Sequence, residues 1–219
     1  MRRRSTRGIS TAEILIGSAL SLMALGSMYS FFLGQTRAMA VQAAYSQSQT
    51  VTRTLIDLMT RELRMAAYDP TDLAIPTTTG SCPGMNSGIM DARSDLLQFR
   101  QDLNGDGDVS DSGETITYDF VEGRIRRKDG DAEAVVIVDG VPEGGFRFRY
   151  YDGSRPPIEL APSGSPAALS ENQRNCVARV RVVAHAEVEP ANVSPDQTQT
   201  VESAAETRIA IRNLSLANF

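Results

Sequence analysis

The feature that most constrains this chain is an apolar stretch near its N-terminus. From Ile14 to Leu33 there is no charged side chain. As an α-helix, this run spans about 30 Å, the thickness of the hydrocarbon core of a bilayer. The only charged residues among the first eight are arginines, at positions 2, 3, 4 and 7. Because basic residues stay on the cytoplasmic side, the sequence predicts one membrane-spanning helix, a cytoplasmic N-terminus and an exported remainder.

Two common membrane-targeting segments share part of this pattern. A cleaved signal peptide has an apolar core of about 7–15 residues that ends at a small-residue site. This run is longer and ends in Phe31, Phe32 and Leu33. A plain signal anchor fits both the length and the flanking charge, so it stays open as an alternative.

The junction before the apolar run carries a more specific pattern. It reads Arg-Gly-Ile-Ser-Thr-Ala-Glu over residues 7–13. This segment resembles the cleavage site of type IV prepilins and pseudopilins. The resemblance implies that prepilin peptidase cuts after Gly8, that Ile9 becomes the methylated N-terminus, and that Glu13 is the fifth mature residue. Most members of the family begin the mature chain with Phe, so Ile9 departs from the pattern.

Glu13 has a physical reason to seek a partner. A carboxylate at the edge of an apolar span costs a few kcal/mol unless it is paired. A cut after Gly8 creates an α-amine four residues away, and the resemblance implies that Glu13 meets this amine on a neighbouring subunit during assembly. The alternative is a carboxylate at the headgroup level that needs no partner. Small-residue pairs in the span, Gly17/Ser21 and Gly26/Ser30, would let neighbouring helices approach closely.

The helical pattern continues beyond the apolar run. Residues 35–68 contain no Gly or Pro, and apolar residues recur every four positions at Val51, Leu55, Met59 and Leu63. This spacing predicts an amphipathic helix that ends before Pro70. We therefore expect one helix over Ile9–Tyr68.

Past Pro70 the period of the sequence changes. Thr71–Asp91 is rich in turn formers and is predicted as a loop. Short, often alternating runs then predict antiparallel strands, with a tight turn at Glu122-Gly123. These strands are Leu96–Arg100, Thr115–Phe120, Arg124–Lys128, Ala134–Asp139, Phe146–Tyr151, Val177–Val188 and Glu206–Asn213. The expected fold class is α+β, with one long N-terminal helix packed on an antiparallel β-sheet head.

The resemblance extends beyond the leader. The run Leu-Arg-Met-Ala-Ala-Tyr at residues 63–68 is similar to a Leu-Arg-x-Ala-Gly-Tyr run of PilW-type minor pilins, with Ala67 in place of the glycine. The strand order and the closing Arg-Asn-Leu are also similar. Minor pseudopilins of type II secretion, especially the J-type, share these features, so both machines stay open.

The resemblance implies the remaining organisation. It places a leader peptide at 1–8, a transmembrane or filament-core helix at 9–34, its amphipathic continuation at 35–68 and a periplasmic head at 69–219. It implies a structural subunit of the bacterial inner membrane and then of the pilus at the cell surface, taking part in pilus assembly or priming. The implied partners are prepilin peptidase, the inner-membrane assembly platform, and other minor and major pilins met through the N-terminal helix.

An acidic segment at residues 102–114 resembles the first half of an EF-hand calcium loop. In such a loop, residues with oxygen ligands alternate along the chain and a glycine at the sixth position, here Gly107, allows the sharp turn, so that the loop surrounds a hard cation. The twelfth position is Gly113 instead of a glutamate, and the flanking segments read as strands. We predict a structural Ca²⁺ site, with a solvated acidic hairpin as the alternative. Its ligands would be Asp102, Asn104, Asp106, Asp108 (more by its backbone carbonyl), Asp111 and Glu114.

The two cysteines, Cys82 and Cys176, both follow the membrane span. The predicted topology exports them to a compartment where disulfides persist, so we expect a bond between them. Closing a loop of this size stabilises by about 4–5 kcal/mol in the chain-entropy model. The alternative is two separate buried thiols.

Other function classes find little support in the sequence. The chain has one histidine, His185, which we expect on a half-exposed strand face. The sequence contains no Ser-His-Asp grouping, no histidine metal motif and no phosphate-binding loop, so we expect neither an enzyme nor a required cofactor. The net charge of −5 argues against nucleic-acid binding. A basic run at 124–128 without aromatics reads as one charged strand face. A function of another class also fits the sequence. This alternative is a membrane-anchored, calcium-dependent binding module that never polymerises.

Overall fold

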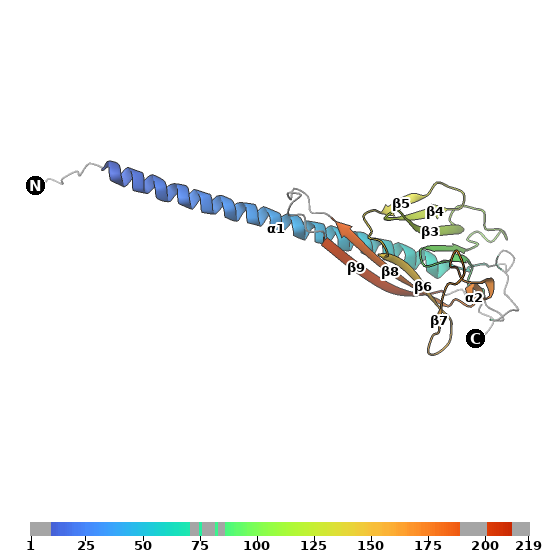
Figure 1. Ribbon diagram of the computed structural model, residues 1–219. Coiled ribbons are helices and arrows are strands. Elements are labelled where there is room, and N and C mark those ends of the chain that lie inside the picture. The colour runs from blue at the N-terminus through green and yellow to red at the C-terminus, as the bar shows by residue number, and fades with distance from the viewer. Residues whose placement is uncertain (1–9, 71–74, 76–81, 83–85, 189–200, 212–219) are drawn as a thin grey trace, which may run out of the picture.

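The computed structural model describes residues 10–70, 75, 82, 86–188 and 201–211. One helix, α1 (Thr11–Met65), extends far from a β-rich head, and only its C-terminal part lies against that head (Figure 1). The first buried residue of α1 is Ala44. The remaining elements are short strands and one five-residue helix. The predicted α+β class, a long N-terminal helix on antiparallel strands, is confirmed.

The end of α1 differs from the prediction. The helix stops at Met65, three residues before Tyr68, and Ala67 adopts a φ of 60°. The cause is tertiary: the amide of Ala67 donates to the carbonyl of Arg100 at 2.9 Å, so the chain leaves the helix to join the edge of a sheet. Pro70 lies beyond this point and does not end the helix.

The first sheet has five antiparallel strands in chain order, β1-β2-β3-β4-β5. The predicted turn at Glu122-Gly123 is confirmed, since φ is 51° and 76° at the two residues, as a type I′ hairpin requires. The predicted loop over Thr71–Asp91 was wrong at its end, where β1 begins. The strands are β1 (Ile89–Ala92), β2 (Leu96–Arg100), β3 (Thr115–Val121), β4 (Arg124–Asp129) and β5 (Val135–Val138).

The other strands form a second sheet, in the order β7-β6-β8-β9, where one sheet was expected. The elements are β6 (Phe146–Tyr151), β7 (Glu159–Leu160), α2 (Glu171–Asn175), β8 (Arg179–Val188) and β9 (Val201–Ala210). β9 begins five residues before the predicted Glu206, because it pairs with the whole length of β8. Its first half, Val-Glu-Ser-Ala-Ala, has little local strand propensity, so this long-range pairing decides its conformation.

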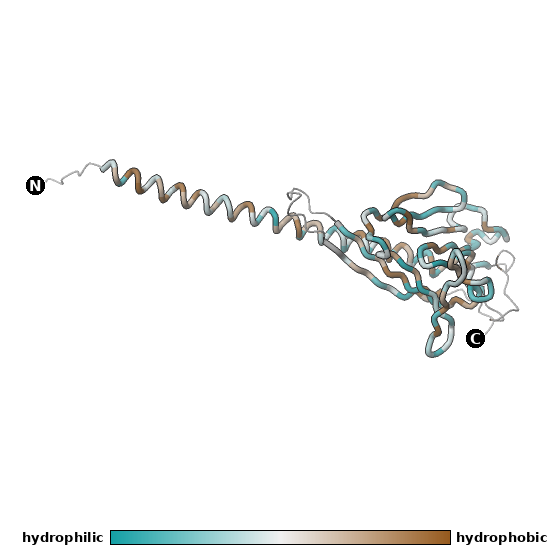
Figure 2. The backbone as a smooth tube through the Cα atoms, viewed as in Figure 1, coloured by the Kyte–Doolittle hydropathy of each residue, from teal (hydrophilic) through white to brown (hydrophobic). Residues whose placement is uncertain are grey.

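A single core joins both sheets to α1. Leu55, Met59 and Leu63 of the helix are buried among side chains from both sheets, such as Phe99 and Phe148. The predicted alternation of β6 is confirmed: Phe146, Phe148 and Tyr150 are buried, while the arginines between them are exposed. Figure 2 shows that hydrophobic residues also colour the part of α1 beyond the head, where the described structure contains nothing to bury them.

Candidate assembly helix and head contacts

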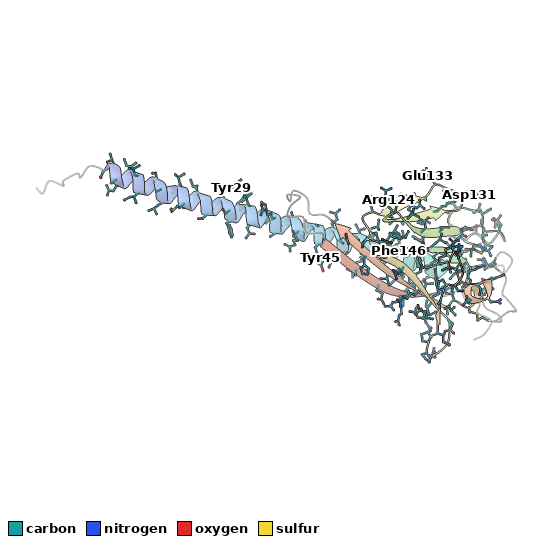
Figure 3. All side chains as sticks on the ribbon, in the orientation of Figure 1. Tyr29, Tyr45, Arg124, Asp131, Glu133 and Phe146 are labelled. Atoms are coloured by element: carbon teal, nitrogen blue, oxygen red, sulfur yellow. A yellow bond between two sulfur atoms is a disulfide. The ribbon has the colours of Figure 1, made fainter. Side chains whose placement is uncertain are left out.

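The N-terminal half of α1 is exposed along its whole length in the described structure. All residues from 11 to 39, here called the bare helix half, are exposed. They include large apolar side chains on all sides, such as Leu15 at 69% and Phe31 at 68% exposure. Tyr29 projects from this segment, far from the head (Figure 3). By length and hydropathy, α1 fits a membrane anchor, and a helix that is apolar all round belongs in a bilayer or among other helices.

The four serine hydroxyls of the bare helix half, and the hydroxyl of Thr36, are already satisfied. Each donates to a backbone carbonyl three or four residues earlier, at distances of 2.8–3.0 Å. Unsatisfied polar groups are costly in apolar surroundings, so these internal bonds let the helix enter such surroundings alone. The donors are Ser18, Ser21, Ser27, Ser30 and Thr36.

The small-residue pairs of the bare helix half lie on opposite sides. Gly26 follows Gly17 by nine residues, which is about two and a half turns of an α-helix. Gly17/Ser21 and Gly26/Ser30 therefore open two different faces. A Cβ added at either glycine would meet no atom within 4 Å. The helix could thus accept close neighbours on two sides.

Glu13 closes the N-terminus of α1. Its Oε2 accepts the Ser10 amide at 3.1 Å, and the Ser10 hydroxyl caps the first turn, which makes a capping box. Glu13 therefore has a local partner as well as the intermolecular role predicted for it. The predicted processing residues Gly8 and Ile9 lie outside the described residues, as does the rest of the leader.

Small polar residues fix α1 where it meets β9. The buried stripe of the helix runs through Ala44, Ser48 and Thr52 before the large residues begin at Leu55. The Ser48 hydroxyl lies 3.0 Å from the carbonyl of Ala186 and 2.5 Å from the Ser203 hydroxyl, which is also 3.1 Å from that of Thr52. Sequence reasoning missed this contact, although the four-residue spacing of Ala44, Ser48 and Thr52 carried the signal.

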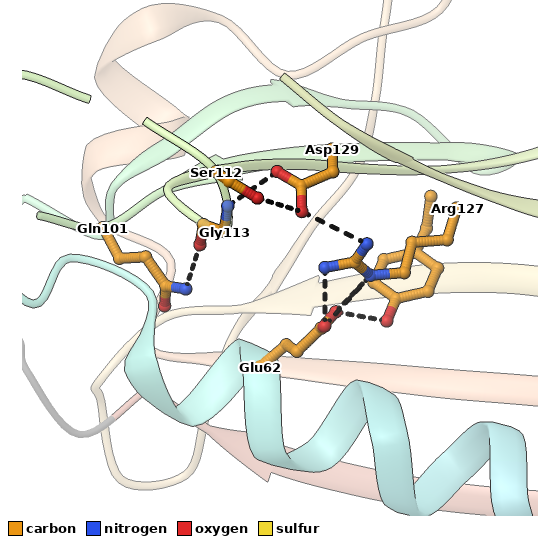
Figure 4. A network of polar contacts seen from close by, with 7 residues as sticks. Glu62, Gln101, Ser112, Gly113, Arg127 and Asp129 are labelled. Atoms are coloured by element: carbon orange, nitrogen blue, oxygen red, sulfur yellow. Dashed lines mark hydrogen bonds and ion pairs between the residues drawn. The ribbon is translucent and has the colours of Figure 1, made fainter. Parts of the chain in front are cut away.

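A charged network ties α1 to the first sheet (Figure 4). The Tyr118 hydroxyl donates to Glu62, and Arg127 pairs with Glu62 at 2.9 Å and with Asp129 at 3.5 Å. Burial, reinforced by the Glu62 charge, raises the pKa of Tyr118. Burial lowers the pKa of Arg127, but the hydrogen bond and charge of Glu62 outweigh this, so that pKa is raised. The Arg127 cation offsets the charge of the Glu62 carboxylate, and the neutral phenol of Tyr118 donates a hydrogen bond to it.

Asp129 extends this network into the predicted calcium loop. It accepts the amide of Gly113 at 2.7 Å, while the Gln101 amide donates to the carbonyl of Gly113 at 2.5 Å (Figure 4). The position of the loop is thus coupled to α1 through Asp129, Arg127 and Glu62.

The six predicted calcium ligands lie on one compact loop, but they do not converge on one point. Asp102 and Glu114 are buried and accept backbone amides of the loop. Asp106 and Asp111 both accept the side-chain amide of Asn104, at 3.0 and 2.8 Å. The carboxylate of Asp108, the remaining predicted ligand, accepts hydrogen bonds from the amide and the hydroxyl of a nearby serine. Among the described residues, no three His, Cys, Asp or Glu side chains are placed to hold a metal, and calcium binding stays a prediction.

Cys82 and Cys176 form the predicted disulfide, with their Cα atoms 5.4 Å apart. The bond joins the segment after α1 to the C-cap of α2, 94 residues later.

The basic run on β4 is largely used inside the molecule. Arg126 forms a two-pronged pair with Asp119, and Arg127 joins the Glu62 network. Arg124 lies 3.4 Å from Asp139 with both side chains more than half exposed. His185 is half-buried on the outer face of β8, beside Ala204, in agreement with its prediction as a strand-face residue.

Comparisons with known proteins add little to this description. No protein-family model matches the chain, and no curated protein matches it. Among solved structures, a type IV-like pilin from Thermus thermophilus aligns over 78% of this chain and 98% of that chain, with 15% identity and a TM-score of 0.42.

Proposed function

We propose that this chain is a minor type IV pilin of the PilW type. Prepilin peptidase removes residues 1–8 of an inner-membrane precursor, and the mature chain assembles through α1 into a pilus, taking part in its assembly or priming. The observation that carries the proposal is the bare helix half, a largely apolar rod with internally satisfied serine hydroxyls, joined to a head that is fixed by a disulfide and a charged network. Such a rod has to be covered by lipid or by other helices.

The leader provides the specific support for this reading. A basic segment, Gly8, Glu13 and the apolar run occur in the order and spacing of the prepilin processing site. The partners would be other minor and major pilins, the peptidase and the assembly platform. The proposed role is structural.

Two alternatives make different predictions. A J-like minor pseudopilin of type II secretion would share the leader and the helix, but its deletion would stop export of secreted proteins and leave piliation intact. A membrane-anchored, calcium-dependent binding module would keep its leader and never enter a filament.

Glu13 provides the sharpest test. The Glu13→Ala variant should be processed and reach the membrane, yet its amount in sheared filaments should fall at least tenfold. The Glu13→Gln variant keeps a capping side chain but loses the charge, so it separates capping from assembly. If the charge is what matters, Glu13→Gln fails like Glu13→Ala, while the exposed helix carboxylate control Asp57→Ala assembles normally. Wild-type filament levels of Glu13→Ala would contradict the proposal.

A further inference from the structure

The face of the second sheet that lies opposite α1 carries an unusual row of charge. The strand register sets Arg149, Arg181 and Arg208 directly beside one another on β6, β8 and β9. Like charges in such positions are destabilising. Carboxylates compensate two of these positive charges, since Arg181 pairs with Glu206 at 2.6 Å and Arg149 pairs with Glu159 at 3.9 Å.

Arg208 differs from these neighbours. Within the described part of the chain it has no carboxylate at ion-pair distance. Its guanidinium carbon lies instead 5.9 Å from the centre of the Tyr151 ring. The charge of Arg208 is therefore held over an aromatic surface and left available to an anion.

A hollow of about 440 Å³ lies beside Arg208. Its other walls are Tyr151, Pro157, Arg179 and Ala210. The strand register explains why this hollow is open. On the same face of the sheet, the row next to the three arginines consists of Tyr151, Arg179 and Ala210, and the small side chain of Ala210 leaves its position largely unfilled. This volume is within the range of about 300–1,000 Å³ typical of ligand pockets.

The walls of the hollow define the chemistry that fits it. Arg179 donates through one Nη to the carbonyl of Asp152 at 3.1 Å, which fixes its guanidinium. Among the described residues its other donors have no partner, so they can serve a ligand. Two guanidinium groups match the oxygens of a carboxylate or phosphate. The rings of Tyr151 and Pro157 add a flat, largely apolar surface. An inorganic anion would leave most of the volume empty.

We propose that this pocket binds a small organic anion, a carboxylate or phosphate carried on a body the size of a sugar ring. Arg179 and Arg208 hold the anionic group, and Tyr151 and Pro157 pack against the ring. The location of such a ligand rests on the proposed function: with α1 in the filament core, the sheet face opposite α1 points outward. A ligand from the surroundings can reach it there more easily than a neighbouring subunit.

Isothermal titration of the purified full chain in detergent micelles tests this binding. The probes are glucuronate, glucose 6-phosphate, neutral glucose and inorganic phosphate. We expect at least one ring-borne anion to bind at least tenfold more tightly than glucose and inorganic phosphate. Glucuronate binding identifies a carboxylate ligand and glucose 6-phosphate binding a phosphate ligand. Failure of both to bind, or equal binding of inorganic phosphate, would overturn the proposal.

Matched arginine variants separate the pocket from the general charge of the face. Arg179→Gln and Arg208→Gln should each weaken binding at least tenfold, with an unchanged melting temperature showing that the head is folded. Arg149→Gln removes the same charge from the same face outside the pocket and should leave the affinity unchanged. An equal loss in Arg149→Gln would show diffuse attraction and refute the pocket. The titration needs neither peptidase nor filament, so its failure is distinct from a failure of the assembly proposal.

Discussion

Removing Arg127 should loosen the attachment of α1 to the first sheet. The Arg127→Met variant keeps the apolar stem of the side chain but loses its charge. Among the described residues, Glu62 would then keep only its hydrogen bond from the Tyr118 hydroxyl, and Asp129 would lose the cation with which it pairs. The Arg127 and Glu62 side chains are only 24% and 18% exposed, so the ion pair is poorly solvated.

The magnitude follows from this burial. Exposed ion pairs contribute about 0–1 kcal/mol, and breaking a fully buried pair costs about 3–5 kcal/mol. For the half-buried Arg127 we expect a loss of about 2 kcal/mol in the free energy of unfolding, between these limits. In a head of this size, that corresponds to a fall in melting temperature of about 4–8 °C.

The matched control is Arg124→Met on the same strand. Arg124 and Asp139 are 51% and 69% exposed, so this variant should change the melting temperature very little. Near-ultraviolet circular dichroism of the full chain in detergent follows the tyrosines of the head during unfolding. Adding Glu62→Gln to Arg127→Met should cost less than the sum of the single changes, because the two residues share one interaction. Equal effects of Arg127→Met and Arg124→Met would refute this reasoning.

Three further predictions concern the head. The pKa of Tyr118 is raised in the folded state, so the neutral phenol stabilises the fold fully below about pH 10, where an unfolded tyrosine begins to titrate. Above that pH the free energy of unfolding should fall by up to about 1.4 kcal/mol per pH unit. Tyr118→Phe should remove this share of the alkaline slope in pH-dependent denaturation, and an unchanged slope would contradict the assignment. Gly88→Ala should destabilise by about 3 kcal/mol on denaturant unfolding, since φ is +68° and the new Cβ would lie 2.6 Å from the amide of Ala67. Gly164→Ala, with φ +90° but no such clash, should cost only about 1 kcal/mol. Millimolar Ca²⁺ should raise the melting temperature of the wild type but not of Asp106→Asn, and no shift in the wild type would refute the calcium site.

The sequence predicted what depends on neighbours along the chain. The apolar run and the four-residue spacing from Leu55 to Leu63 located α1, and the alternation in Phe146–Tyr151 located β6. The disulfide followed from the expected export of both cysteines, and the structure contains it.

The features that the sequence did not reveal depend on long-range pairing. The sheets divide because β6 pairs with β8 and not with β5, and the early start of β9 comes from the register of β9 with β8. Glu62 lies 56 residues from Tyr118 and 65 from Arg127, and no local pattern connects them. The row containing Arg208 likewise appears only once three strands are aligned, although its charge was visible in the sequence.

The central claim is that this chain is processed and assembled as a pilin. Intact-mass measurement and N-terminal sequencing of the protein from its native membrane, in hosts with and without prepilin peptidase, test it most directly. We predict a mature chain that begins at methylated Ile9 only when the peptidase is present. A chain that still begins at Met1 in the presence of the peptidase would contradict the claim and favour the anchored binding module.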